Sequence, residues 1–345
     1  MDEARVPRFD ELMRRPVATG LAIAAIATTL LWWSGRNIDA LVMSRTAFSH
    51  EPWRLFTSAL PHVDIIHLGF NVYWLLVIGT RIERSFGARA LIVLSLVTSV
   101  GSAALEHALF DGGVGLSGIG YGLVGFGWAV ERDERQISRP IVPEGTIRLF
   151  SIWFVVCCIT TLTSVWKVAN AAHAGGAILG VLTGLAWAHR GMFWPWVTVL
   201  SLAGFIAMAS PPLRLFVNLG EGIAHDLADE AYELIEANPE GAVERYSQAL
   251  TFMENANWRF NLGVAYERLG LHVQTSQMML RAHELEPDNV AYRRGAAAAQ
   301  AREAADAQER DDQSEMIRYL ERALELDPQH EDASVWRRIL ANASQ

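Results

Sequence analysis

Seven apolar runs within the first 210 residues limit what this chain can fold into more than any other feature. A helix needs about 20 apolar residues to cross a bilayer, with a range of about 17–25. A backbone at that depth must satisfy its own hydrogen bonds, so runs of this length predict helices. We therefore expect an all-α fold built around a polytopic membrane helix bundle. The runs are Val17–Trp33, Ile66–Thr80, Leu91–Leu109, Ser117–Val130, Leu149–Leu162, Val168–Trp187 and Phe193–Ser210.

Charge divides the chain into two unlike parts. Residues 1–214 carry a net charge of +3, whereas residues 215–345 carry −12. An almost neutral, tryptophan-rich part followed by an acidic, helix-rich part indicates a membrane domain at 1–214 and a soluble domain at 215–345. Because phosphate binding needs clusters of lysine and arginine, the acidic domain argues against nucleic acid as a partner. The sequence predicts no cofactor and no metal.

The placement of basic residues predicts the orientation of the bundle. With the N-terminus in the cytoplasm, twelve of the seventeen basic residues before position 215 lie on the cytoplasmic side. Seven spans then place the acidic domain outside the cytoplasm. If Phe193–Ser210 lies along the interface instead of crossing, that domain stays in the cytoplasm. The twelve are Arg5, Arg8, Arg14, Arg15, Arg81, Arg84, Arg89, Arg132, Arg135, Arg139, Arg148 and Arg190.

The acidic domain carries an internal repeat. A motif Asn-Leu-Gly-Val-Ala-Tyr at 261–266 is followed by Ala282 and Pro287, which resembles the tetratricopeptide repeat of about 34 residues. The same ending recurs at Ala323 and Pro328, so the second repeat carries about seven residues more than the usual length. A weaker unit ends near Ala242, Tyr246 and Ala249. We expect a soluble α-solenoid of tetratricopeptide-like repeats that binds a protein partner; a generic bundle of helical hairpins is the alternative.

Ser117 and His173 stand out because polar residues at membrane depth are costly and point to function. Gly115 permits a tight turn before Ser117, which then opens a helix whose free N–H groups can hold an oxyanion. His173 lies among small residues that let helices approach closely. A serine and a histidine together indicate a nucleophile and its base. The structural alternatives are a helix cap for Ser117 and an interhelical hydrogen bond for His173.

His67 and Asn71 are four residues apart in the second run and share one helical face. An imidazole and an amide at membrane depth can donate hydrogen bonds to a developing negative charge. Hydrogen bonds between neighbouring helices are the structural alternative.

Taken together and in this order, the motifs resemble those of the rhomboid family of intramembrane serine proteases, over about residues 40–190. The family's second-helix motif is similar to 67–71, its nucleophile motif to 115–118, and its sixth-helix motif to 169–173 with the glycines that follow. The pair in its first long loop is similar to Trp53 and Arg54. The resemblance implies six helices around a water-filled cavity, with the seventh run as an addition.

The resemblance also implies roles. Ser117 is the nucleophile, and His173 is the general base and later the acid. His67 and Asn71 line the oxyanion site, together with the backbone N–H groups of Leu116 and Ser117. Tyr121 packs against the imidazole of His173, and Gly115 belongs to the nucleophile motif. The implied substrates are transmembrane segments of membrane proteins, and the expected location is a bacterial inner membrane.

Two other function classes remain open. A non-catalytic protein of rhomboid-like fold can bind transmembrane helices and use the repeat domain as an adaptor, although the intact Ser117 and His173 favour the enzyme. A transporter or channel also fits seven spans, but we expect spans without charged residues, which disfavours that class.

Overall fold

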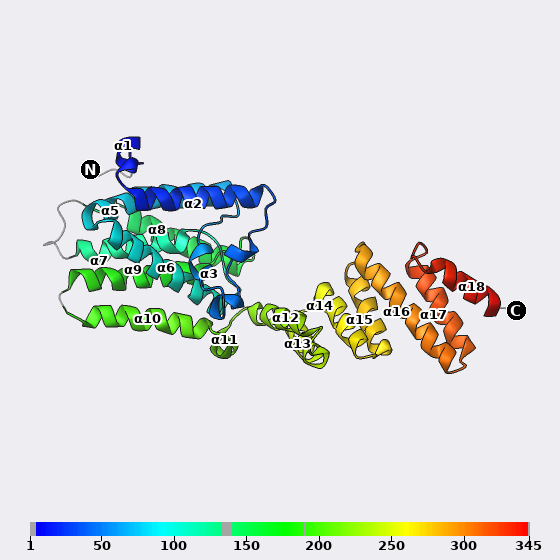
Figure 1. Cartoon of the computed structure of the whole chain (residues 1–345). Coiled ribbons are helices and arrows are strands. Elements are labelled where there is room, and N and C mark those ends of the chain that lie inside the picture. Colours follow the sequence, from blue (N-terminus) through cyan, green and yellow to red (C-terminus); the bar gives the residue numbers. More distant parts are fainter. Residues whose placement is uncertain (1–4, 133–139, 190, 344–345) are drawn as a thin grey trace. The chain divides into compact units, whose positions relative to one another are not determined.

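The computed structural model describes residues 5–132, 140–189 and 191–343, and all regular structure in these ranges is helical (Figure 1). The chain divides into two compact units, Met1–Gly222 and Ile223–Gln345. The predicted domain boundary at 214 instead falls inside helix α11 (Pro211–Val217). The described residues do not include the predicted domain ends at 1 and 345. They also do not include three basic residues used to predict the orientation, namely Arg135, Arg139 and Arg190.

Each of the seven predicted runs lies on helix in the first unit. Within the described residues, four segments are both long and apolar enough to cross a membrane, namely Pro16–Trp33, Ile65–Phe86, Ala88–Leu109 and Asn170–Ala188. The second of these is continuous but contains a π-helical turn, so it consists of α4 (Ile65–Trp74), η3 (Leu75–Gly79) and α5 (Thr80–Phe86). The others are α2 (Pro16–Trp33), α6 (Ala88–Leu109) and α9 (Asn170–Ala188).

The remaining predicted runs form shorter helices. These are α7 (Ser117–Glu131), α8 (Thr146–Leu162) and α10 (Phe193–Ala209). Small helices occur in the N-terminal segment and in the first long loop: α1 (Phe9–Met13), η1 (Asp39–Leu41), η2 (Arg45–Phe48) and α3 (Arg54–Thr57). An all-helical chain with apolar membrane helices was the expectation, and it is confirmed.

Helix α7 is largely buried and packs closely against α9. Two glycines of α9 make this approach possible. A Cβ atom on Gly176 would collide with the carbonyl oxygen of Gly118, and one on Gly180 with that of Gly122. Small residues at helix interfaces allow backbones to touch in this way. The glycines therefore bring the beginnings of α7 and α9 side by side.

The expectation that the spans contain no charged residues is wrong. Glu106 in α6 is buried and lies inside the predicted run Leu91–Leu109. Glu83 in α5 is also buried, three residues beyond the end of the predicted run Ile66–Thr80. Glu83 accepts hydrogen bonds from the backbone N–H groups of Val17 and Ala18, at 3.2 and 3.0 Å, where α2 begins. Buried charges are tolerated when hydrogen bonds compensate their lost hydration. The sequence argument overlooked that a carboxylate can be held at membrane depth by a helix N-terminus.

The segment after α10 is fastened to the C-terminal end of α6. Arg214 in α11 is 1% exposed. Its Nε donates to the carbonyl oxygen of His107 and one Nη to that of Phe110, both at 2.6 Å. Asn218 also donates to the Phe110 carbonyl, at 2.8 Å. These contacts satisfy carbonyls that the end of α6 leaves without intrahelical partners. They explain why the first unit extends to Gly222 instead of ending at 214.

The second unit is a series of antiparallel helices. They are α12 (Gly222–Leu234), α13 (Pro239–Phe252), α14 (Ala256–Arg268), α15 (His272–Leu285), α16 (Val290–Glu309), α17 (Gln313–Leu326) and α18 (Ala333–Ala343). Ala282 and Ala323, which occupy matching places in the predicted repeat, are both fully buried. Helix α16 has 20 residues against 13 in α14, and this difference of seven equals the extra length in the second predicted repeat.

Candidate active site

The first residue of α7 and the fourth residue of α9 form a direct hydrogen bond. Nε2 of His173 lies 2.9 Å from Oγ of Ser117. His173 is 4% exposed, and Ser117 is half-buried at the edge of a small cavity. A nucleophile and a base within hydrogen-bond reach are the requirement for activating a serine. The structure thus brings together the two residues that the sequence predicted as catalytic.

Packing and not a carboxylate orients the imidazole of His173. The ring of Tyr121 stacks on it with centroids 4.5 Å apart and planes 22° from parallel. The hydroxyl of Tyr121 in turn donates to the carbonyl oxygen of Phe150 at 3.1 Å, which fixes the tyrosine on α8. Nδ1 of His173 has no hydrogen-bond partner in the described part of the chain. Stacking on Tyr121 therefore supplies the orientation of the ring.

His67 and Asn71 both lie on α4, and the ring of His67 lies beside Gly115 in the turn before Ser117. Asp64 caps this helix by accepting the N–H groups of Ile66 and His67, each at 2.8 Å. Asn71 is 6% exposed, and its Nδ2 has no partner among the described residues. An unpaired buried amide donor is costly unless it serves a ligand.

Gly115 has a backbone φ of +116°, which side chains disfavour. A Cβ atom there would also lie 2.6 Å from Cε1 and 2.8 Å from Nε2 of His67. Glycine at 115 therefore permits both the turn into α7 and the contact with His67. The N–H of Gly115 donates to the carbonyl oxygen of Ser58 at 3.1 Å, which fixes the turn.

His62 belongs to the site and was missed in the sequence. It is fully buried, and its ring lies 4.8 Å from that of His67, edge to face. Its Nε2 accepts the N–H of Leu116 at 3.2 Å. The expectation that Leu116 offers its N–H to an oxyanion is thus not met here, because that N–H is already engaged. His62 lies five positions before His67, and a histidine inside an apolar segment was the available signal.

Glu106 is the second residue that sequence reasoning missed. Its Oε2 accepts the N–H of Ala172, the residue before His173, at 2.9 Å. Ala169, which precedes α9, has no side-chain acceptor, so a carboxylate from α6 caps this helix. Glu106 also lines a cavity of about 30 Å³ beside Ser117, together with Ser58 and Ser102. A polar cavity of this size is large enough for about one water.

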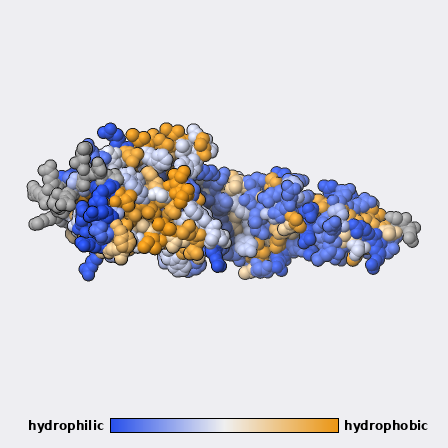
Figure 2. All heavy atoms as spheres, turned by 90° about the horizontal axis from the view of Figure 1, so that it is seen from above, coloured by the Kyte–Doolittle hydropathy of each residue, from blue (hydrophilic) through white to orange (hydrophobic). Residues whose placement is uncertain are grey.

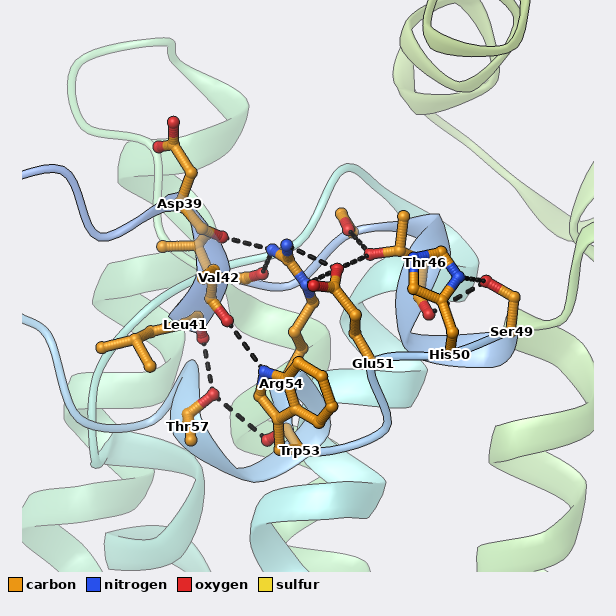
Figure 3. A network of polar contacts seen from close by, with 12 residues as sticks. Asp39, Leu41, Val42, Thr46, Ser49, His50, Glu51, Trp53, Arg54 and Thr57 are labelled. Carbon is orange, nitrogen blue, oxygen red and sulfur yellow. Dashed lines mark hydrogen bonds and ion pairs between the residues drawn. The ribbon is translucent and has the colours of Figure 1, made fainter. Parts of the chain in front are cut away.

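The first long loop is held by Arg54 (Figure 3). Its guanidinium donates to the carbonyl oxygens of Asp39 and Val42, and pairs with Glu51 at 2.6 Å. The same carboxylate oxygen of Glu51 accepts the hydroxyl of Thr46, also at 2.6 Å. Trp53 donates from Nε1 to the carbonyl of Ala40 at 3.0 Å. The Trp-Arg pair noticed in the sequence is therefore a structural clamp that closes the loop on itself.

Comparison with known proteins finds a recognised domain that contains the candidate site residues on α4, α7 and α9. A Rhomboid domain matches residues 49–190. The chain is 32% identical over 190 residues to the rhomboid protease GlpG of Photorhabdus laumondii subsp. laumondii, covering 53% of this chain and 65% of that protein. For GlpG of an Enterobacter species the identity is 30% over 192 residues, 53% of this chain and 67% of that protein.

A third relative has higher identity over a shorter stretch. GlpG of Yersinia pestis is 34% identical over 153 residues, which is 42% of this chain and 53% of that protein. The chain thus spans between about half and two thirds of the length of these relatives. The matched domain contains Ser117, His173, His67, Asn71 and Glu106.

Proposed function

The chain belongs to the rhomboid family, and we propose that it is an intramembrane serine endopeptidase that cleaves transmembrane segments of membrane proteins. The observation that carries the proposal is the 2.9 Å contact between Nε2 of His173 and Oγ of Ser117. The relatives named rhomboid protease support the same class of enzyme. In a helix-binding protein without catalysis this contact would be only an interhelical hydrogen bond, and Ser117 would not react with a serine-directed probe.

In the proposed reaction, Oγ of Ser117 attacks the scissile carbonyl carbon and its proton passes to Nε2 of His173. The carbonyl oxygen becomes an oxyanion, held by Asn71, His67 and the backbone N–H of Ser117. That N–H has no intrahelical acceptor, because Ser117 is the first residue of α7. His173 then protonates the leaving amine, and a water activated by the same histidine releases the acyl group. The cavity at Ser58, Ser102 and Glu106 offers a place for that water.

Covalent labelling tests the proposal directly. A fluorophosphonate probe should label Ser117 in native membranes, and Ser117→Ala should abolish both the labelling and the cleavage of a transmembrane model substrate. His173→Ala should cause a similar loss, and the two losses should not add, since the residues act as a unit. Ser117→Ala protein that is folded and still cleaves the substrate would refute the proposal. Correct insertion is checked by protease protection of the membrane fraction.

We expect cleavage where the substrate helix is weak. A peptide bond inside a helix has its carbonyl hydrogen-bonded and sterically hidden, so local unwinding must precede attack. Introducing glycine or proline beside the cut site should therefore raise the cleavage rate. A substrate series in which such changes never raise the rate would contradict this expectation.

We propose that the second unit is a tetratricopeptide-like solenoid that recruits a protein partner or substrate. The buried alanines at 282 and 323 and the seven-residue extension of α16 support the repeat. Solenoids offer extended concave surfaces to peptides, and the charge of −12 on residues 215–345 favours basic partners by steering.

The path of α10 in the first unit supports one side of the membrane for the second unit, hereafter also called the tail. Helix α10 starts beyond the C-terminal end of α9, while α11 is fastened to the C-terminal end of α6. Helix α10 therefore runs from one end of the bundle to the other, which favours a seventh crossing. In an inner membrane with a cytoplasmic N-terminus, the tail then lies outside the cytoplasm. Labelling of a cysteine introduced into the tail by an impermeant reagent on intact cells tests this orientation.

A further inference from the structure

An open cavity of about 290 Å³ lies at the end of the first unit where α2 begins and α5 ends. Ser117 is at the other end, because α6 starts beside α5 and finishes shortly before α7. The proposed chemistry uses none of the residues around this cavity. Five arginines and two acids line it: Arg5, Arg14, Arg15, Arg81 and Arg84, with Asp10 and Glu11.

The two acids pair with arginines other than Arg14, Arg15 and Arg84. Glu11 pairs with Arg5 at 3.1 Å, and Asp10 faces Arg8 at 3.7 Å. Among the described residues, the side chains of Arg14 and Arg84 have no hydrogen bond or ion pair, and Arg15 donates to a backbone carbonyl. The positive charges of Arg14, Arg15 and Arg84 around one cavity repel each other, and an anion bound between them would relieve that repulsion.

Apolar side chains are exposed beside the cavity, on the short helix α1. Phe9 and Met13 on α1 are 78% and 66% exposed, and residues four apart share one face of a helix. Such a face inserts into the boundary between headgroups and acyl chains. In Figure 2 the hydrophobic surface of the first unit gives way to hydrophilic atoms at its N-terminal end. An anion that reaches the cavity from this side carries a hydrocarbon tail.

We propose that this cavity binds the phosphate headgroup of an anionic phospholipid, with Arg14, Arg15 and Arg84 as its cationic contacts. The guanidinium group suits phosphate because its planar donors match the phosphate oxygens in pairs. The acyl chains of the lipid lie beside the exposed apolar face of α1. This binding is independent of proteolysis and takes place at the opposite membrane face.

The test uses the full chain, purified in a neutral detergent, and native mass spectrometry to count retained lipids. Phosphatidylglycerol should be retained in preference to phosphatidylcholine. The double variant Arg14→Gln and Arg84→Gln should weaken this retention roughly thirtyfold, as expected for the loss of two cations near a phosphate. The double variant with lysine at both positions should retain most of the binding, because the charge remains.

Arg89→Gln is the matched control. Arg89 is an exposed arginine at the beginning of α6, at the same end of the bundle, but it does not line the cavity. An equal loss of phosphatidylglycerol with Arg89→Gln would overturn the proposal in favour of general surface charge. Equal retention of phosphatidylcholine, or displacement of the lipid by millimolar inorganic phosphate, would also overturn it. Size-exclusion profiles of the variants show whether each one is folded.

Discussion

The two units cap their helices differently. In the second unit, Ile223–Gln345, hereafter the acidic unit, several helix N-termini are capped by the residue that precedes them. In the first unit, Met1–Gly222, hereafter the membrane unit, two helix N-termini are capped by side chains from distant parts of the chain. Asn238, Asn255, Asn289 and Asp312 each accept a backbone N–H two or three residues further on. In the membrane unit, Glu83 caps α2 from 65 residues away and Glu106 caps α9 from 66 residues away. Among the described helices of the membrane unit, α4 has a local cap of this kind, Asp64.

The surrounding solvent explains the difference. A helix end in water can bond to water if its cap is lost, so a local side chain adds only about 1 kcal/mol. A helix end inside a bilayer has no water, and each unpaired group costs several times more. The membrane unit therefore couples residues that are remote in sequence, and two of these couplings, from Glu106 and His62, reach the candidate active site. The following predictions test this contrast, beginning with the largest effect.

The largest effect concerns Asn71 and His67, the oxyanion donors that we propose on α4. Asn71→Ala and His67→Ala should each slow cleavage by roughly 10²–10³-fold, since one such donor contributes about that much and others remain. The loss should appear in kcat, with KM little changed, because the charge exists only in the transition state. Steady-state kinetics on a transmembrane substrate provide the measurement.

The matched control is His107→Leu. His107 is also a buried histidine, 2% exposed, but it stacks on Phe48 and lies outside the site. Its replacement should leave kcat within a few-fold of the original. Wild-type rates in the double variant of Asn71 and His67 would show that these two residues are structural only.

Glu106 gives the next largest effect. Glu106→Ala leaves the N–H of Ala172 buried without an acceptor, at a cost of roughly 1–3 kcal/mol. Because the next residue is His173, we expect kcat to fall roughly tenfold to hundredfold. Glu106→Gln keeps an acceptor oxygen and should lose much less. Fluorophosphonate labelling rates and cleavage kinetics measure the same effect independently.

Glu131→Ala separates positioning from simple destabilisation. Glu131 is at the other end of α7, where its Oε1 accepts the N–H groups of Ile141 and Val142. Its loss should lower the thermal stability of the first unit without a selective fall in kcat. If Glu131→Ala and Glu106→Ala reduce kcat equally at matched stability, Glu106 has no positioning role.

The same contrast explains what the sequence could predict. The membrane helices follow from apolar run length, and the predicted bounds of the first run differ from α2 by one residue. The candidate site residues could be predicted because each lies in a short sequence motif, at 67–71, 115–118 or 169–173. These residues are Ser117, His173, His67 and Asn71. Tyr121 came from the same resemblance, and the structure stacks it on His173.

Long-range partners could not be predicted. Nothing in the sequence near Ala172 shows that its N–H bonds to Glu106, and nothing near Leu116 shows that its N–H bonds to His62. The predicted domain boundary at residue 214 differs from the division after Gly222 for a related reason. The charge pattern changes near residue 214, but Arg214 is held by carbonyls of His107 and Phe110, more than a hundred residues earlier.

A smaller effect is expected for a local cap in the acidic unit. Asn255→Ala removes the acceptor for the N–H of Trp258, 3.1 Å away, and should destabilise α14 by about 1 kcal/mol. Hydrogen exchange on the full chain should show faster exchange in α14 and its neighbours. Cleavage of a model substrate should be unchanged. A fall in kcat would show that the two units are energetically coupled, and Asn255→Asp, which keeps an acceptor, should restore both readouts.

The smallest effect is expected when the whole acidic unit is removed at the correct place. All the candidate catalytic residues precede residue 190, so a chain ending at Gly222 should cleave a generic transmembrane substrate at the original rate. A chain ending at Ser210 loses Arg214 and Asn218, and it leaves the carbonyls of His107 and Phe110 without these donors. Since α6 also carries Glu106, this shorter chain should be less stable and less active. Neither truncated chain should cleave natural substrates that depend on the acidic unit for recruitment. If the chain ending at Gly222 is folded but inactive on every substrate, the acidic unit is part of the enzyme, and the separation between the two units fails.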